Sequence, residues 1–236
     1  MPLLRSLRRL AVVAVGGALA GTLSAAPASA DLDGPVTFGN QGDVPIIGDW
    51  NGDGDDEIGV YRPDNRTFYR YGNYAPITLG NTGDVPIVGD WNGNGVDEIG
   101  VYRPGTSVFY RYGNYAPIPY GNRGDVPIVG DWNGNGVDEI GVYRPAYRTF
   151  YYYGRLNSDQ FGNTGDVPLT GDWLGRGYSD IGVYRPGNQT FYRRGLTAIP
   201  LGNAGDKPIV GDWDGDGTDN TGVYRPAYRT FYPHIP

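Results

Sequence analysis

The chain has 236 residues, among them 40 glycines, 20 tyrosines and no cysteine. Without cysteine the fold cannot depend on disulfide bonds, and this composition favours an all-β protein over a helical one. The 26 acidic residues outnumber the 19 basic ones, and the formal net charge of −7 argues against nucleic acid as a partner, because no basic surface attracts phosphate.

Residues 1–30 differ in character from the rest of the chain. Three arginines come before an apolar run over residues 10–23, and residues 28–30 read Ala-Ser-Ala, a small-x-small cleavage pattern. We expect a secretory signal peptide over 1–30 and a secreted, monomeric domain over 31–236 that has no stable membrane insertion. The alternative is a retained membrane anchor, which the glycines in the apolar run and the missing stop-transfer pattern disfavour.

From residue 45 onward, a unit of about 41 residues is repeated five times. Each copy contains one tryptophan, and these lie at Trp50, Trp91, Trp132, Trp173 and Trp213. In the first copy, residues 45–48, 57–62, 67–71 and 75–79 are rich in β-branched and aromatic types and bounded by turn residues, which predicts four strands. Four strands per repeat is typical of a propeller blade. A right-handed β-roll is the alternative, but its nonapeptide period is absent.

The two ends of the predicted domain complement each other. Residues 35–44 match residues 76–85, which form the tail of a repeat, whereas the last repeat ends at Pro236 after its third predicted strand. We expect the N-terminal segment to complete the last blade and so leave no open sheet edge there. The predicted fold is therefore an all-β, five-bladed propeller of four-stranded antiparallel blades.

An oxygen-rich loop of nine positions follows the first predicted strand of each repeat, and its ninth position is the first residue of the second predicted strand. Asp or Asn occupies positions 1, 3 and 5, a glycine allows the sharp turn, and a backbone carbonyl at position 7 and a side chain at position 9 complete an all-oxygen set, which favours calcium. The predicted ligand sets are Asp49, Asn51, Asp53, Asp55 and Glu57 in the first loop; Asp90, Asn92, Asn94, Val96 and Glu98 in the second; Asp131, Asn133, Asn135, Val137 and Glu139 in the third; and Asp212, Asp214, Asp216, Thr218 and Asn220 in the fifth. The alternative is that these residues only cap tight turns.

The fourth loop breaks the ligand pattern. Leu174 and Arg176 replace two of its ligands, so we expect Asp172 and Asp180 to face a guanidinium and to bind no metal. Up to four structural calcium ions are therefore predicted. The first and fifth loops offer three ligand carboxylates each and the second and third offer two, so we expect affinity to follow this order.

These loops resemble the calcium loops of FG-GAP (also called VCBS) repeats, the blades of integrin α-chain propellers and of many secreted bacterial proteins. The shared pattern has Asp at position 1, Asp or Asn at 3 and 5, Gly at 6 and an acid at 9, followed by an apolar strand, here Ile58-Gly59-Val60. The resemblance covers nearly all of residues 31–236 and implies calcium-binding propeller blades. Propellers of this family commonly have seven blades, whereas five are expected here.

Two further motifs recur in every repeat, Tyr-Arg-Pro and Gly-Asn-x-Gly-Asp-x-Pro. One arginine and one aspartate per repeat predict an ion pair between blades, for example Arg62 with Asp43 or Asp84. The alternative is that the arginines and tyrosines contact a ligand.

The expected function is binding, not catalysis. His234 is the one histidine of the chain and there is no cysteine, which disfavours a Ser-His-Asp or Cys-His catalytic arrangement. A carboxylate-dependent glycoside hydrolase is the remaining enzymatic alternative. Repeated aromatic and amide groups suit lectin-like recognition of glycans or cell-surface polymers through shallow sites, with a protein-binding or cell-envelope scaffold as the alternative. The candidate ligand contacts are Asn73, Tyr74, Asn114, Tyr115, Tyr147 and Tyr228.

Overall fold

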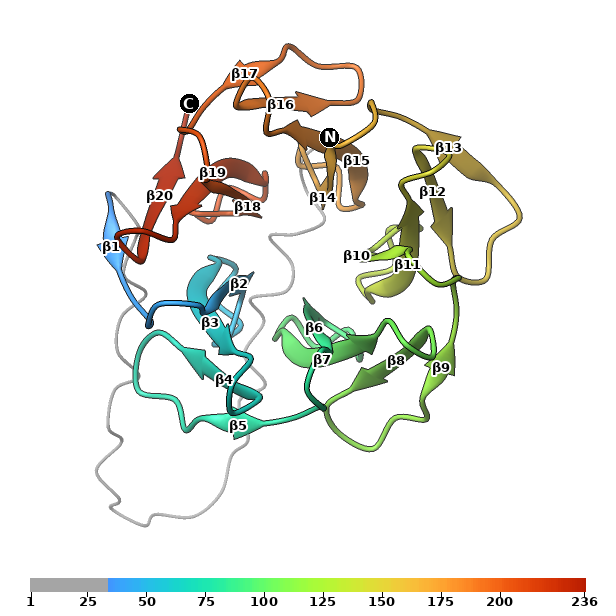
Figure 1. The fold of residues 1–236 in the computed structure, drawn as a ribbon, viewed down its shortest axis with the longest axis horizontal. Helices are drawn as coiled ribbons and strands as arrows, with labels where there is room; N and C mark the ends of the chain where they lie inside the picture. The colour runs from blue at the N-terminus through green and yellow to red at the C-terminus, as the bar shows by residue number, and fades with distance from the viewer. Residues whose placement is uncertain (1–33) are drawn as a thin grey trace, which may run out of the picture.

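The computed structural model describes residues 34–236 as a ring of five β-sheets (Figure 1). Each sheet has four antiparallel strands, which confirms the predicted five-bladed propeller. The predicted signal peptide over 1–30 lies outside the described residues. Among residues 34–236, no helix is long and apolar enough to cross a membrane.

The five blades follow one another along the chain. Blade 1 contains β2 (Val44–Gly48), β3 (Glu57–Arg62), β4 (Thr67–Arg70) and β5 (Ile77–Thr78). Blade 2 contains β6 (Val85–Gly89), β7 (Glu98–Arg103), β8 (Val108–Arg111) and β9 (Ile118–Pro119). Blade 3 contains β10 (Val126–Gly130), β11 (Glu139–Arg144), β12 (Thr149–Tyr152) and β13 (Ser158–Gln160). Blade 4 contains β14 (Val167–Gly171), β15 (Asp180–Arg185), β16 (Thr190–Arg193) and β17 (Ile199–Pro200). Blade 5 contains β18 (Lys207–Gly211), β19 (Asn220–Arg225), β20 (Thr230–His234) and, from the other end of the chain, β1 (Val36–Thr37).

The first three strands of each repeat match the prediction to within one residue, but the fourth is shorter than predicted. In blade 1 it covers only Ile77–Thr78 in place of 75–79. Pro76 explains part of the difference, because proline has no N–H to donate to the neighbouring strand. The short outer strand also limits the exposed edge of each blade.

The ring is closed by β1, as predicted. This strand pairs antiparallel with β20, with Val36 opposite Phe231 and Thr37 opposite Thr230 (Figure 1). The threonine hydroxyls lie 3.0 Å apart, and the Phe38 N–H donates to the Arg229 carbonyl at 2.9 Å. Residues almost two hundred positions apart thus form one sheet, and β20 is not left as an open edge.

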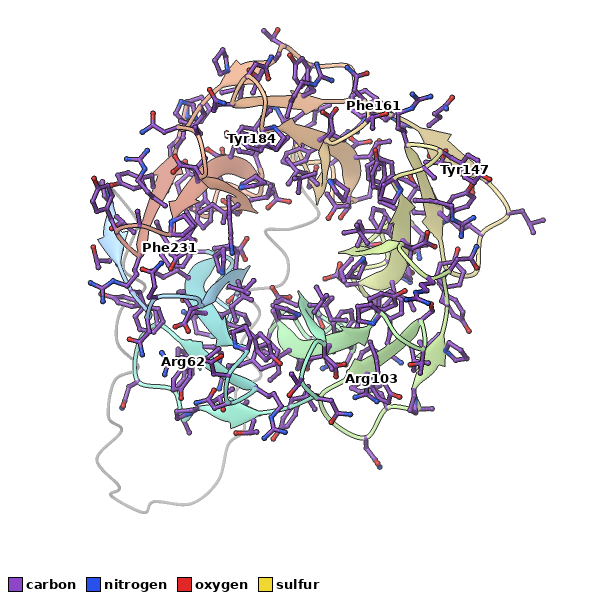
Figure 2. The ribbon with its side chains drawn as sticks, viewed as in Figure 1. Arg62, Arg103, Tyr147, Phe161, Tyr184 and Phe231 are labelled. Carbon is purple, nitrogen blue, oxygen red and sulfur yellow. The ribbon has the colours of Figure 1, made fainter. Side chains whose placement is uncertain are left out.

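The core lies between neighbouring blades. Ile58 and Val60 of blade 1 pack with Ile209, Trp213 and Tyr224 of blade 5, so no blade buries its apolar face alone. Each blade also buries a Tyr–Phe pair with ring centroids 4.6 to 4.7 Å apart, and Figure 2 labels one member of two such pairs, Tyr184 and Phe231. The tyrosine of the Tyr-Arg-Pro motif is therefore a core residue.

Two recurrent glycines mark close approaches of other atoms. A Cβ on Gly59 would lie 2.9 Å from Ile46 Cγ1 and 3.0 Å from the Tyr69 carbonyl oxygen, both on neighbouring strands of the same sheet. A Cβ on Gly48 would lie 2.7 Å from Val88 Cγ1 of the next blade. Glycine at the second position lets the innermost strands approach one another around the axis.

Candidate calcium loops and ligand-facing surfaces

The antiparallel strands divide the connections of each blade between two ends of the ring. One end, called the loop end, carries the nine-residue loops such as 49–57 and the following turns such as 71–76. The other, called the hairpin end, carries the turns between the second and third strands, such as 63–66, and the connectors between blades, such as 79–84. Side chains from the two ends cannot contact one small ligand together.

In the first loop, the predicted ligands at positions 1, 3 and 9 come together. The Asp49 carboxylate accepts backbone N–H groups of Asn51 and Gly54 at 3.2 and 2.9 Å. Glu57 accepts the Trp50 N–H at 2.9 Å and the side-chain amide of Asn51. The second and third loops repeat these contacts. The capping role of the aspartates is thus present in these loops, and the calcium ligation predicted for them stays a prediction.

The fifth loop offers the most suitable oxygens. Carboxylate oxygens of Asp212, Asp214 and Asp216 all lie within 4.8 Å of one another. Asp212 and Asn220 are only 5% and 6% exposed, and the Oδ1 atom of each is buried without a hydrogen-bond partner in the described structure. The Asn220 amide donates to the Thr218 carbonyl at 2.9 Å, which leaves its own oxygen free. Because an unpaired buried oxygen is costly, these two atoms fit a hard cation.

The raised pKa values of two loop carboxyl groups also favour a bound cation. Burial, followed by neighbouring acids, raises the pKa of Glu57 to about 7. Burial raises the pKa of Asp212 to about 7 as well, with Asp219, Asp216 and Asp214 adding to the rise. Without a cation these carboxyl groups therefore repel one another, and a bound divalent ion would favour their ionised forms.

The fourth loop contains the guanidinium that the sequence predicts. Arg176 forms an ion pair with Asp180, and its guanidinium lies 4.3 Å from the centroid of the Tyr178 ring. The Asp172 carboxylate accepts the backbone N–H of Arg176 at 2.9 Å. The cationic side chain thus occupies the part of the loop where the ligands at positions 3 and 5 are missing.

Position 8 of each loop has a role that sequence reasoning missed. The Asp97 N–H donates to the Asp49 carbonyl at 2.8 Å, and Asp97 Oδ2 accepts the Asp49 N–H at 3.0 Å, so the second blade holds the first ligand of the preceding loop. Asp56 does the same for Asp212 and joins blade 1 to blade 5. The corresponding residues in the other blades are Asp138, Ser179 and Asp219. The available signal was the recurrence of a short polar side chain directly before position 9.

The predicted arginine–aspartate pairs are present in all five repeats, but they lie within blades and not between them. Arg62 binds Asp43 through two hydrogen bonds of 3.0 and 2.9 Å, and Asp84 pairs with Arg103. Asp43 is 2% exposed and also accepts the Asn40 N–H at 2.7 Å. The pair therefore fastens the connector from the preceding blade to the end of β3. The remaining pairs are Arg144–Asp125, Arg185–Asp166 and Arg225–Asp206.

At the loop end, the structure adds an arginine to the predicted ligand contacts. Arg70 lies 4.7 Å from the centroid of the Tyr74 ring, and Arg111 lies 4.5 Å from that of Tyr115. The two tyrosines are half-buried and not exposed as expected, because they pack against the core clusters of Trp50 and Trp91 and beside the arginines, whereas the preceding Asn73 and Asn114 are exposed.

Tyr147 and Tyr228 lie apart from these sets. They occupy the turns of the hairpin end in blades 3 and 5 and are 60% and 64% exposed. Figure 2 shows Tyr147 at the outer rim of the ring. The predicted ligand contacts therefore form two separate groups, one at each end of the propeller.

Comparisons with known proteins do not assign the chain to a family. No protein-family model matches the chain, and no curated protein matches it. Among solved structures, it is similar to the crystal structure of BBS1N in complex with ARL6DN, soaked with lead, with 14% identity and a TM-score of 0.41 over 85% of this chain and 69% of that chain. By its own strand order the chain is an all-β propeller of five four-stranded blades, an architecture compatible with a binding module or a scaffold.

Proposed function

We propose that this protein is a secreted, calcium-stabilised binding module that recognises glycans or other cell-surface polymers through repeated shallow sites. The observation that carries the proposal is the repetition of one surface set on neighbouring blades: Arg70, Asn73 and Tyr74 on blade 1, and Arg111, Asn114 and Tyr115 on blade 2. Two similar sets on one rigid ring suit a polymer with repeating units.

The chemistry of each set suits a sugar. The half-buried tyrosine ring offers an apolar surface for the C–H groups of a pyranose, and the exposed asparagine amide and the arginine offer hydrogen bonds to its hydroxyls. Arg70 lies 5.9 Å from the Trp50 ring, and among the described residues no carboxylate forms an ion pair with it. Its N–H groups are therefore available to a ligand.

Calcium has a structural part in this proposal. The first, second, third and fifth loops would hold the ion through the residues predicted from sequence, and it would supply positive charge where these carboxylates now crowd together. The loops are linked to one another through position 8, so an ion in one loop stabilises the junction with its neighbour. Four such sites would stiffen the loop end on which Tyr74 and Tyr115 lie.

Weak single sites gain strength when one polymer engages both. Linked binding events commonly raise the overall affinity by about 10² to 10⁴ over that of one site. We therefore expect tight binding to a polymeric glycan and weak binding to its isolated unit. We propose no catalytic role, because the acids of the repeats are engaged in the loops and in the Arg–Asp pairs.

A glycan array with calcium, repeated with a chelator, tests the proposal. We expect the protein to bind several related glycans. The double variant Tyr74→Ala and Tyr115→Ala should reduce this binding at least tenfold. Tyr178→Ala is the matched control, because this tyrosine stacks on an arginine in the same way but has no adjacent Asn-Tyr set. An empty array combined with retained binding to whole cells or to a protein would reject glycan recognition in favour of a scaffold.

A further inference from the structure

A cavity of about 250 Å³ opens between blades 2 and 3 at the hairpin end of the ring. It is separate from the loop-end sets described above, because it lies beside the connector that follows β9. Its lining residues are Tyr120, Gly121, Asn122, Val142, Arg144 and Tyr151. The first three belong to the connector, and the others belong to β11 and β12 of blade 3.

The walls of the cavity are aromatic and firmly positioned. Tyr120 meets Tyr153 edge to face, with ring centroids 5.4 Å apart, and the Arg144 guanidinium lies 4.7 Å from the centroid of the Tyr151 ring. A Cβ on Gly121 would lie 2.9 Å from Val142 Cγ1, so the connector fits closely against β11. Burial raises the pKa of Tyr120, which keeps its hydroxyl protonated and able to donate.

The cavity offers hydrogen-bonding groups without net charge. Arg144 binds Asp125 through two hydrogen bonds of 2.9 Å, so the guanidinium is neutralised by a buried carboxylate. The remaining polar groups are the Asn122 amide and the phenol hydroxyls of the two tyrosines. Such a lining fits an uncharged ligand with several hydroxyls better than an acid or an amine.

One sequence change distinguishes this junction from the other four, and a second, shared with blade 5, occurs together with it only here. The residue before the connector glycine is Tyr120 here, whereas the other blades have Phe38, Leu79, Phe161 and Leu201. Only this junction therefore places a hydroxyl at that position.

The second change frees the hydroxyl of the facing tyrosine. In blades 1 and 4, Asn65 and Asn188 donate to the hydroxyls of Tyr69 and Tyr192 at 3.0 and 2.9 Å. Blade 3 has Tyr147 in place of that asparagine, and the described structure shows no hydrogen bond to the Tyr151 hydroxyl. Tyr147 is 60% exposed and lies in the turn between β11 and β12, the two strands that carry Arg144 and Tyr151.

We propose that this cavity binds one neutral pyranose unit, with Tyr120 and Tyr151 as its contacts and Tyr147 at its rim. The choice of a sugar rests on the proposed function, whereas the site is new to it and lies at the opposite end of the ring. The volume is below the range of pockets for drug-sized ligands, which fits one sugar ring and not a longer chain.

Blade 5 supplies an internal control for the proposal. Tyr228 occupies the same hairpin position there as Tyr147, but the facing connector carries Leu201 in place of Tyr120. Tyr147→Asn would restore the asparagine found in blades 1 and 4 and engage the Tyr151 hydroxyl. Tyr228→Asn makes the same change at a junction that has Leu201 and therefore lacks the distinguishing hydroxyl.

The test is binding of methyl glycosides of glucose, galactose, mannose and N-acetylglucosamine, measured by saturation-transfer NMR and titration. At least one should bind, with Tyr120→Leu weakening it about tenfold or more and Tyr120→Phe weakening it less, because phenylalanine keeps the ring. Leucine and phenylalanine occur naturally at this position in the other blades, so both variants should fold. Tyr147→Asn should weaken binding, and Tyr228→Asn should leave it unchanged.

The outcomes separate this site from the proposed function. If the glycan array is positive but Tyr120→Leu does not change glycoside binding, the cavity is not a sugar site and the proposed function still stands. An empty array with glycoside binding that depends on Tyr120 would reject polymer recognition and keep the cavity. Tighter binding of glucuronic acid than of the neutral glycosides would contradict the uncharged site.

Discussion

Without calcium, this protein is expected to lose stability as the pH rises from 5 to 8. Burial raises the pKa of Glu57 from 4.5 to about 7 and that of Asp212 from 3.8 to about 7. Between their unfolded and folded pKa values, the folded protein holds more protons than the unfolded chain, so its free energy of unfolding falls with rising pH. The stabilisation is complete below about pH 4 and is lost once the pH has passed 7.

The size of the effect follows from these pKa values. Each of the two groups loses about 2.5 kcal/mol of stabilisation between pH 5 and 8, or about 5 kcal/mol together. For a domain of this size, that corresponds to a fall in melting temperature of roughly 10 to 20 °C. Burial also raises the pKa of Asp138 to about 7, which adds to the loss in the same direction.

Melting curves from circular dichroism at pH 5, 6, 7 and 8, with a chelator and with calcium, measure this effect. Calcium should flatten the pH dependence and stabilise more at pH 8 than at pH 5, because the ion competes with protons for the same carboxylates. Glu57→Gln combined with Asp212→Asn should give a shallower slope in the chelator, since neither amide titrates. A melting temperature that is constant or rises with pH in the chelator would refute the reasoning.

Three further predictions concern the Arg–Asp pairs, the closure of the ring and the fourth loop. Arg103→Met leaves the buried Asp84 without its guanidinium and should lower the free energy of unfolding, measured by urea titration, by about 3 kcal/mol. Adding Asp84→Asn to this variant should recover part of the lost stability. A loss near zero would show that the ion pair is dispensable. Deletion of residues 31–38 removes β1 and exposes the edge of β20. The deletion should lower the melting temperature and promote self-association in size-exclusion chromatography. An unchanged melting temperature and elution volume would disprove the closure of the ring by β1. Leu174→Asn with Arg176→Asn rebuilds the fourth loop and should add one calcium site in calorimetric titration; an unchanged number of sites would contradict the assigned ligand positions.

Much of the fold could be predicted because the chain repeats itself. The strand periods recur every 41 residues or so, and the tail-like segment at 35–44 indicated how the ring closes. The sequence of the fourth loop also predicted that the Arg176 guanidinium takes the place of a metal ion, because two ligands are missing there beside two acids. The ion pair between Arg176 and Asp180 agrees with this prediction. These features depend on residues that are near in sequence or related by the repeat.

Other features required the tertiary structure. The choice of Asp43 over Asp84 as the partner of Arg62 depends on where the connector meets β3, and both spacings are available in the sequence. Tyr74 and Tyr147 look alike as exposed aromatic candidates, but the alternation of antiparallel strands places them at opposite ends of the ring.

The sequence by itself determined the number of blades, the order of their strands and the positions of the candidate ligands, because each repeat encodes its own sheet and turns. Only the tertiary structure decided how the blades join: Asp97 binds Asp49 across 48 residues, and Asp56 binds Asp212 across 156. Such contacts depend on the curvature with which the sheets pack around the axis. That curvature comes from the packing of all five blades together and is not encoded in any single repeat.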